Sequence, residues 1–191
     1  MKKYEFTGET KRINTINGAV TLHRIKATAA FGNVKCGDMG GWIEREENLS
    51  HDGDAWVSGN ARVSGDARVS GDVWVFGNAQ VADDAQVSGN ARVFGDVRVF
   101  GDVRVSGNAQ VYGNKHVLLV GPIGSRNDYT TFFRNQNRGI SVLCGCFLGE
   151  IDKFIEKVIE THGENKYASV YRAAAELAKL QIDLSEIEEE K

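Results

Sequence analysis

Residues 121–127, Gly-Pro-Ile-Gly-Ser-Arg-Asn, combine the residue types that an anionic ligand needs. Two glycines let backbone N–H groups approach a ligand, a serine adds a hydroxyl, and an arginine adds a bidentate cation. A threonine and a tyrosine further along the chain add a hydroxyl and an aromatic face. The predicted ligand-binding residues are Gly124, Ser125, Arg126, Thr131 and Tyr171. The stretch lacks the Gly-Lys-Ser/Thr of a Walker loop. The alternative is that it is a linker in which the arginine pairs with an acidic side chain.

The cysteines and the net charge bear on whether the chain binds a metal, nucleic acid or a membrane. Cys144 and Cys146 place two thiols on one side of an expected strand. A zinc site wants four ligands, and only Cys36 and His162 remain as further partners. The alternative is that the thiols pack as small apolar groups, so we predict no metal and no cofactor. Three cysteines, an odd number, indicate a reducing, cytoplasmic setting. A net charge of −3 gives no basic field for duplex nucleic acid or for a membrane surface.

The middle of the chain repeats with a period of six residues. Valine occupies every sixth position from Val57 to Val117, and the residue two positions before it is Ala or Val until Lys115. The two positions before that small residue are Gly followed by Asn or Asp. Asp83 is the single exception, since it stands where the other hexads have glycine. The apolar pair points inward, the Gly-Asn or Gly-Asp pair forms the corner, and stacked coils pair their backbones. The pattern predicts a parallel β-helix.

In hexads such as Val-Ser-Gly-Asn-Ala-Arg at 57–62, the chain resembles the hexapeptide-repeat family. The resemblance implies a left-handed β-helix of triangular section with three hexads per coil. Glycine lies two residues after the valine, which is closer to the repeat proteins of phages and prophages than to the acyltransferases of the family. An acyltransferase of this fold uses a histidine as general base, and His51 is the candidate here. The regular coils carry no inserted loop to cover a long acyl donor, which disfavours that activity.

Three hexads per coil place residues eighteen apart on the same face of the β-helix. One outward face, which we name the aromatic face, then carries Trp56, Trp74, Phe76, Phe94 and Tyr112. A soluble monomer rarely leaves such a patch bare, and aromatic residues are enriched at subunit interfaces. We predict that this face joins chains in a homo-oligomer, and the family resemblance favours a trimer. The alternative is cover by the N-terminal segment or the C-terminal helices of the same chain.

The segments on either side lack the repeat. Before it, β-like stretches at 3–7 and 20–26 are separated by a hairpin signal at Asn17 and Gly18, and 37–43 is interpreted as a cap. After it, we expect strands at 117–120, 129–133 and 140–144, a helix at 151–159 and a second helix from about Lys166. The face of that second helix is expected to carry Val170, Tyr171, Ala174, Leu177, Ala178 and Gln181.

The predicted fold is mainly β: a left-handed parallel β-helix of hexapeptide repeats with a small C-terminal α+β domain. We place an N-terminal β segment and cap at 1–50, the β-helix at 51–118 and the C-terminal domain at 119–191.

No hydrolytic constellation, phosphate loop or metal quartet occurs in the sequence, which favours a non-enzymatic oligomeric binding protein. Its C-terminal domain would hold a small anionic, nucleotide-like ligand or contact a host protein. The resemblance to phage and prophage proteins implies a phage-encoded protein that counters host defence by sequestering a nucleotide-type signal in the host cytoplasm. The alternatives are an acyltransferase-like enzyme and a purely structural or protein-blocking oligomer.

Overall fold

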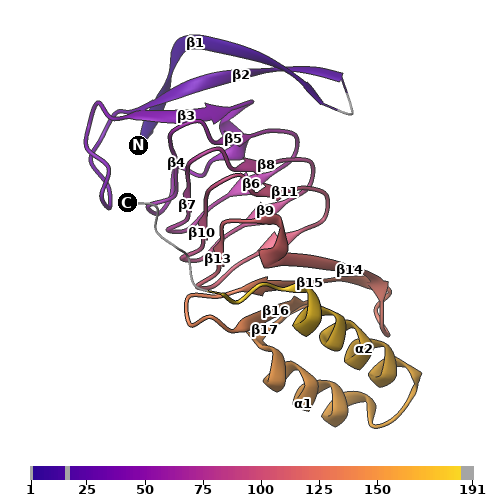
Figure 1. The fold of residues 1–191 in the computed structure, drawn as a ribbon. Helices are drawn as coiled ribbons and strands as arrows, with labels where there is room; N and C mark the ends of the chain where they lie inside the picture. The colour runs from indigo at the N-terminus through magenta and orange to yellow at the C-terminus, as the bar shows by residue number, and fades with distance from the viewer. Residues whose placement is uncertain (1, 16–17, 186–191) are drawn as a thin grey trace.

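The 191-residue chain is described here by a computed structural model that covers residues 2–15 and 18–185. An N-terminal sheet, a stack of coils and a C-terminal domain with two helices follow one another in space (Figure 1). Asn17 of the expected hairpin signal and the acidic residues 186–190 lie outside the described residues. None of the helices in the described ranges is both long enough and apolar enough to cross a bilayer.

Each hexad forms a two-residue strand that ends on its valine. These strands are β4 (Trp56–Val57), β5 (Arg62–Val63), β6 (Arg68–Val69), β7 (Trp74–Val75), β8 (Gln80–Val81), β9 (Gln86–Val87), β10 (Arg92–Val93), β11 (Arg98–Val99), β12 (Arg104–Val105) and β13 (Gln110–Val111). Strands eighteen residues apart pair in parallel, which gives the three faces β4-β7-β10-β13, β6-β9-β12 and β5-β8-β11. The predicted parallel β-helix with three hexads per coil is therefore confirmed.

The inward apolar pairs fill the coils, as the period predicts. Val87 and Ala85, for example, are both 0% exposed. Glycine is required at the corners because the backbone there turns through the left-handed region. At Gly65 the φ angle is +67°, and a Cβ would lie 2.8 Å from the backbone nitrogen of Asp83 in the next coil. Asp83 itself adopts φ 60°, a conformation that Asp tolerates better than most residues.

The N-terminal segment extends one face of the coils and closes their first end. The hairpin of β1 (Tyr4–Thr15) and β2 (Gly18–Ala27) pairs through β2 with β3 (Met39–Ile43). Strand β3 then pairs in parallel with β5, which makes a six-stranded sheet in the order β1-β2-β3-β5-β8-β11. Apolar side chains of this segment, and of Leu49 just after the short 3-10 helix at Glu46–Asn48, continue the core of the coils together with Tyr4, Ile25 and Ile43.

The C-terminal domain is an antiparallel sheet with two helices on one face. After a 3-10 turn at Asn114–His116, its strands follow in the order β14 (Val117–Ile123), β15 (Asp128–Arg134), β16 (Ile140–Cys144) and β17 (Phe147–Glu150). The helices are α1 (Ile151–His162) and α2 (Lys166–Gln181), at the positions that the sequence predicted. Alternation along β15 sends Phe133 into the core of the coils and Phe132 into the core beneath the helices. The sheet thus closes the second end of the coils.

The expected inward face of α2 is partly wrong. Tyr171, Ala174 and Ala178 are buried, as predicted. Val170 and Leu177, however, are 40% and 48% exposed, because they lie on the side of α2 that no other described element covers.

Candidate functional site

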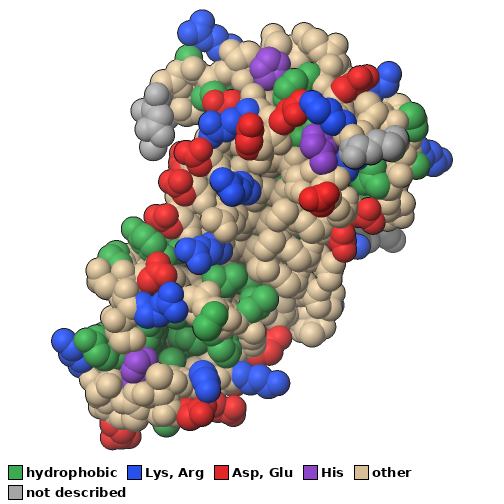
Figure 2. Space-filling model, turned by 180° about the vertical axis from the view of Figure 1, so that it is seen from behind, with side chains coloured by type: hydrophobic (Ala, Val, Ile, Leu, Met, Phe, Trp, Pro, Cys, Tyr) green, Lys and Arg blue, Asp and Glu red, His purple; other side chains and the backbone are tan. Residues whose placement is uncertain are grey.

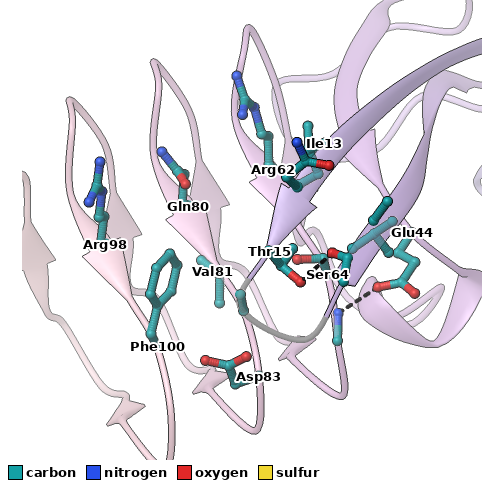
Figure 3. A pocket seen from close by; sticks show the side chains of 16 residues that line it. Ile13, Thr15, Glu44, Arg62, Ser64, Gln80, Val81, Asp83, Arg98 and Phe100 are labelled. Atoms are coloured by element: carbon teal, nitrogen blue, oxygen red, sulfur yellow. Dashed lines mark hydrogen bonds between the residues drawn. The ribbon is translucent and has the colours of Figure 1, made fainter.

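A groove with a volume of about 650 Å³ lies between the β5-β8-β11 face and the tip region of the β1-β2 hairpin (Figure 3). This volume is in the range of small-molecule sites, roughly 300–1,000 Å³. The hairpin forms one wall because the six-stranded sheet continues from the coils into β1 and β2, which extend over the outward side of the coils. The groove therefore results from joining two segments that are distant in sequence.

The floor of the groove carries two guanidinium groups with an amide between them. Arg62, Gln80 and Arg98 occupy the same position in three successive coils and project in a row (Figure 3). Adjacent strands lie about 4.8 Å apart, so the two arginines are separated by about 9–10 Å along the stack. Neither guanidinium group has an ion pair with any residue in the described part of the chain.

A second row beside the arginines gives the groove its apolar character. Ser64, Ala82 and Phe100 follow the inward valines of the same three strands. The ring of Phe100 is 40% exposed and faces the groove. The paired residues Ile13 and Val20 line the hairpin wall. A planar ring in the groove could stack on the exposed Phe100 ring.

The acidic side chains of the groove lie at its corner. Glu44 accepts a hydrogen bond of 2.7 Å from the backbone N–H of Gly65, so that carboxylate is already engaged in holding a corner. Asp83 occupies the position that other coils give to glycine, and its carboxylate lines the groove below Gln80 and Phe100 (Figure 3). Asp83 therefore offers an acceptor to an N–H donor of a ligand.

The groove combines cationic, aromatic and acceptor groups. Its described lining residues include the guanidinium groups of Arg62 and Arg98, the ring of Phe100 and the carboxylate of Asp83. Arginine stays protonated at all physiological pH values and binds phosphate or carboxylate through two parallel N–H donors. The arrangement thus suits an anionic ligand that also carries a ring and amino groups.

The sequence-predicted ligand residues are brought together only in part. Gly124, Ser125, Arg126 and Tyr171 lie close together beside Cys144, and we name these five residues the Tyr171 cluster. Burial raises the pKa of the Tyr171 hydroxyl and Cys144 raises it further, while Ser125 and Arg126 act in the opposite direction.

Gly124 in this cluster leaves room for the Tyr171 side chain. Its φ angle is +71°, and a Cβ at this position would overlap the Tyr171 ring and hydroxyl. Ser125 and Arg126 remain exposed, and Arg126 has no ion pair among the described residues.

Thr131 lies away from the cluster, on the opposite face of the sheet. Its Oγ1 accepts a hydrogen bond of 3.2 Å from the backbone N–H of Arg104 in the last coil. The neighbouring Thr130 faces the helices instead, and its Oγ1 lies 3.2 Å from the Sγ of Cys144. Side chains alternate along a strand, so only one of the two threonines can reach Tyr171.

His51, the acyltransferase candidate, is built into the N-terminal cap. Its ring stacks on Tyr4 with 4.4 Å between centroids, and its Nδ1 accepts a hydrogen bond from the backbone N–H of Lys3. Burial lowers the pKa of His51, and its Nε2 is buried without a hydrogen-bond partner in the described chain. This geometry gives no support to a role as general base.

The aromatic face is covered at both ends by its own chain. Trp56 is 3% exposed, with Phe31 at 5.5 Å and Tyr4 at 6.5 Å between ring centroids. At the other end, the Arg134 guanidinium lies 5.0 Å from the centroid of the Tyr112 ring.

The middle of the aromatic face, formed by Trp74, Phe76 and Phe94, is half-buried. Phe76 and Phe94 stack with 4.8 Å between their centroids. The apolar patch that one chain leaves for a partner is therefore smaller than the sequence suggests.

The cysteines and corner aspartates do not gather into a metal site. Within the described residues, no three His, Cys, Asp or Glu side chains lie close enough to hold an ion. Cys36 and Cys146 are both exposed, at opposite ends of the molecule.

Comparisons with known proteins concern the coils alone. Residues 55–71, 85–99 and 97–113 match the family model described as the YdcK beta solenoid repeat. A search of curated proteins found no match to this chain. The family match supports the repeat fold and leaves the groove and the C-terminal domain to be interpreted from their geometry.

Proposed function

We propose that the protein is a non-catalytic β-solenoid binding protein, and that its ligand site is the groove between the coils and the N-terminal hairpin. The observation that carries this proposal is the pair of guanidinium groups, Arg62 and Arg98, which line one cavity and lack ion pairs in the described chain. Two cations about 9–10 Å apart on one groove floor repel each other, and an anionic ligand between them would relieve that repulsion.

A nucleotide-type ligand fits the whole set of groups. Its phosphates would lie along Arg62 and Arg98, and its base would stack on Phe100. The exocyclic amino group of a base would donate to Asp83, while Gln80 can both donate and accept. The Tyr171 cluster is the second candidate site, favoured by the exposed Arg126, but Tyr171 fills the space above Gly124.

Replacing both groove arginines should abolish most of the affinity. We expect Arg62→Ala with Arg98→Ala to weaken nucleotide binding by about a hundredfold or more, since each charge-assisted hydrogen bond contributes about 1.5–3 kcal/mol and 1.4 kcal/mol is a factor of ten. Isothermal titration calorimetry with mononucleotides, dinucleotides and cyclic oligonucleotides measures this change.

Two control variants locate the site in the same titrations. Arg68→Ala removes an exposed arginine from the β6-β9-β12 face, and the affinity should remain that of the wild type. Arg126→Ala should also leave it unchanged. If Arg126→Ala abolishes binding and the groove variant does not, the Tyr171 cluster is the site. If no nucleotide gives heat with the wild type, the nucleotide proposal is wrong.

We also propose that chains assemble through the middle of the aromatic face, where apolar rings are half-exposed. We expect Trp74→Glu with Phe94→Glu to lower the subunit count, because apolar contact is lost and like charges face each other across the interface. Native mass spectrometry reports the count. The matched control is Gln86→Glu with Ser70→Glu, which adds the same charges to the β6-β9-β12 face. A folded aromatic-face variant that keeps the wild-type mass would exclude this interface.

The biological use that follows from such a protein is sequestration. A scaffold that holds a nucleotide without converting it removes that molecule from solution in proportion to the number of sites. The likeness of the hexads to phage and prophage repeat proteins supports the proposal that the sequestered molecule is a host defence signal.

A further inference from the structure

Helix α2 has a second apolar stripe that faces away from its own domain. The inner side of α2 is buried against the sheet and α1, while four apolar residues lie on its outer side. They are Val170, Ala173, Leu177 and Leu180. Val170 and Leu177 are 40% and 48% exposed, and Leu180 is 87% exposed. Hydrophobic side chains gather over this end of the molecule in the space-filling view (Figure 2).

The spacing of the stripe is the same in both directions. At 100° per residue, positions 170, 173, 177 and 180 fall within one narrow sector of the helix, at intervals of three, four and three residues. An antiparallel copy of α2 with its two-fold axis near residue 175 would place Val170 against the partner's Leu180. The same axis would place Ala173 against the partner's Leu177, so a small residue faces a large one at both positions.

The charges at the two ends of α2 agree with this orientation. Lys166 is exposed at the first turn, and Asp183 follows the last turn. The Asp183 carboxylate accepts a hydrogen bond of 2.9 Å from the backbone N–H of Ser185, and like any ordinary aspartate it is negative at neutral pH. An antiparallel pair brings each lysine to the end of the partner helix that carries the aspartate, and it also aligns the helix dipoles favourably. A parallel pair would place like charges together instead.

We propose that α2 docks against the α2 of a second copy of this chain, in antiparallel orientation, through Val170, Ala173, Leu177 and Leu180. This isologous contact is separate from the aromatic face and from the groove. A helix of sixteen residues, about 24 Å long, gives an interface at the lower end of the specific range. The dimer should therefore be concentration-dependent.

A charge-swap pair tests both the contact and its orientation. We expect Leu180→Glu and Val170→Lys, each alone, to halve the subunit count of the wild-type assembly, because each buries an unpaired charge at the contact. Mixed in equal amounts, the two variants should recover the wild-type count in assemblies that contain both chains, since the new glutamate then faces the new lysine across the α2 contact. Native mass spectrometry over a concentration series distinguishes the two chains by mass.

Controls separate loss of docking from loss of fold. Thr161→Glu adds the same charge to an exposed position of α1 and should keep the wild-type count. Circular dichroism should be unchanged in all variants, since Leu180 and Val170 lie outside the core. A wild type that remains single at every concentration, or a Leu180→Glu variant that keeps the wild-type count, would overturn the proposal. A mixture that fails to recover the wild-type count in assemblies of both chains would overturn the antiparallel pairing.

Discussion

Val87→Asp should lower the melting temperature by about 6–20 °C, whereas Gln86→Asp should change it by no more than about 2 °C. An unpaired charge in an apolar interior costs roughly 3–5 kcal/mol, and 1 kcal/mol shifts the melting temperature of a chain of this size by about 2–4 °C. Val87 is 0% exposed, while the neighbouring Gln86 points to solvent. The two variants introduce the same side chain one position apart, on opposite sides of the coil wall.

Thermal melts followed by circular dichroism near 218 nm, the β-sheet region, measure both variants. Equal melting temperatures would mean that the inward register of the valine column is wrong. A large loss in Gln86→Asp alone would mean that the coil is turned inside out relative to the structure described above.

Gly124→Ala should cost about 2–5 kcal/mol of stability, and Gly101→Ala only about 1–2 kcal/mol. Both glycines have φ near +70°, so both variants carry the cost of a left-handed alanine, about 1–2 kcal/mol. A Cβ at Gly101 meets no atom within 4 Å, whereas one at Gly124 overlaps Tyr171. The difference between the variants is therefore the cost of displacing a buried tyrosine, about 1–3 kcal/mol.

Urea denaturation of both variants measures this difference. Equal free energies of unfolding would mean that Tyr171 does not lie over Gly124, and the space above the loop would again be open to a ligand.

The sequence predicts the coils well because their signal is redundant. Eleven valines from Val57 to Val117 keep one period, and each coil repeats the same corner chemistry. The helices α1 and α2 are also predicted, since their apolar spacing and the glycine after α1 agree. The short strand β17 is missed, because four residues of mixed polarity in Phe147–Glu150 carry no period of their own.

The sequence pattern does not show which face of β15 or of α2 packs against which neighbour. Residues 130–133 are Thr-Thr-Phe-Phe, so both faces of β15 look alike in sequence. Which threonine reaches Tyr171 depends on which face of the sheet closes the coils. Val170 and Leu177 raise the same difficulty. An apolar residue on a helix suggests that it is buried, but the sequence does not show which element packs against it.

The groove was missed for a different reason. The eighteen-residue period already places Arg62, Gln80 and Arg98 in one row, but a row of polar side chains on a solenoid is ordinarily a solvated face. The row becomes one side of a cavity only because β3 joins the coil sheet and carries the β1-β2 hairpin over it. That arrangement is a tertiary contact between segments about forty residues or more apart, for which no local pattern exists.

Native mass spectrometry of the protein incubated overnight with the best-binding nucleotide tests whether the groove holds a nucleotide without converting it. We expect one ligand per chain, with its mass unchanged, in the wild type and in Arg126→Ala. We expect none in Arg62→Ala with Arg98→Ala. A bound species of altered mass would contradict the non-catalytic function, and ligand retained by the double variant would contradict the groove as its site.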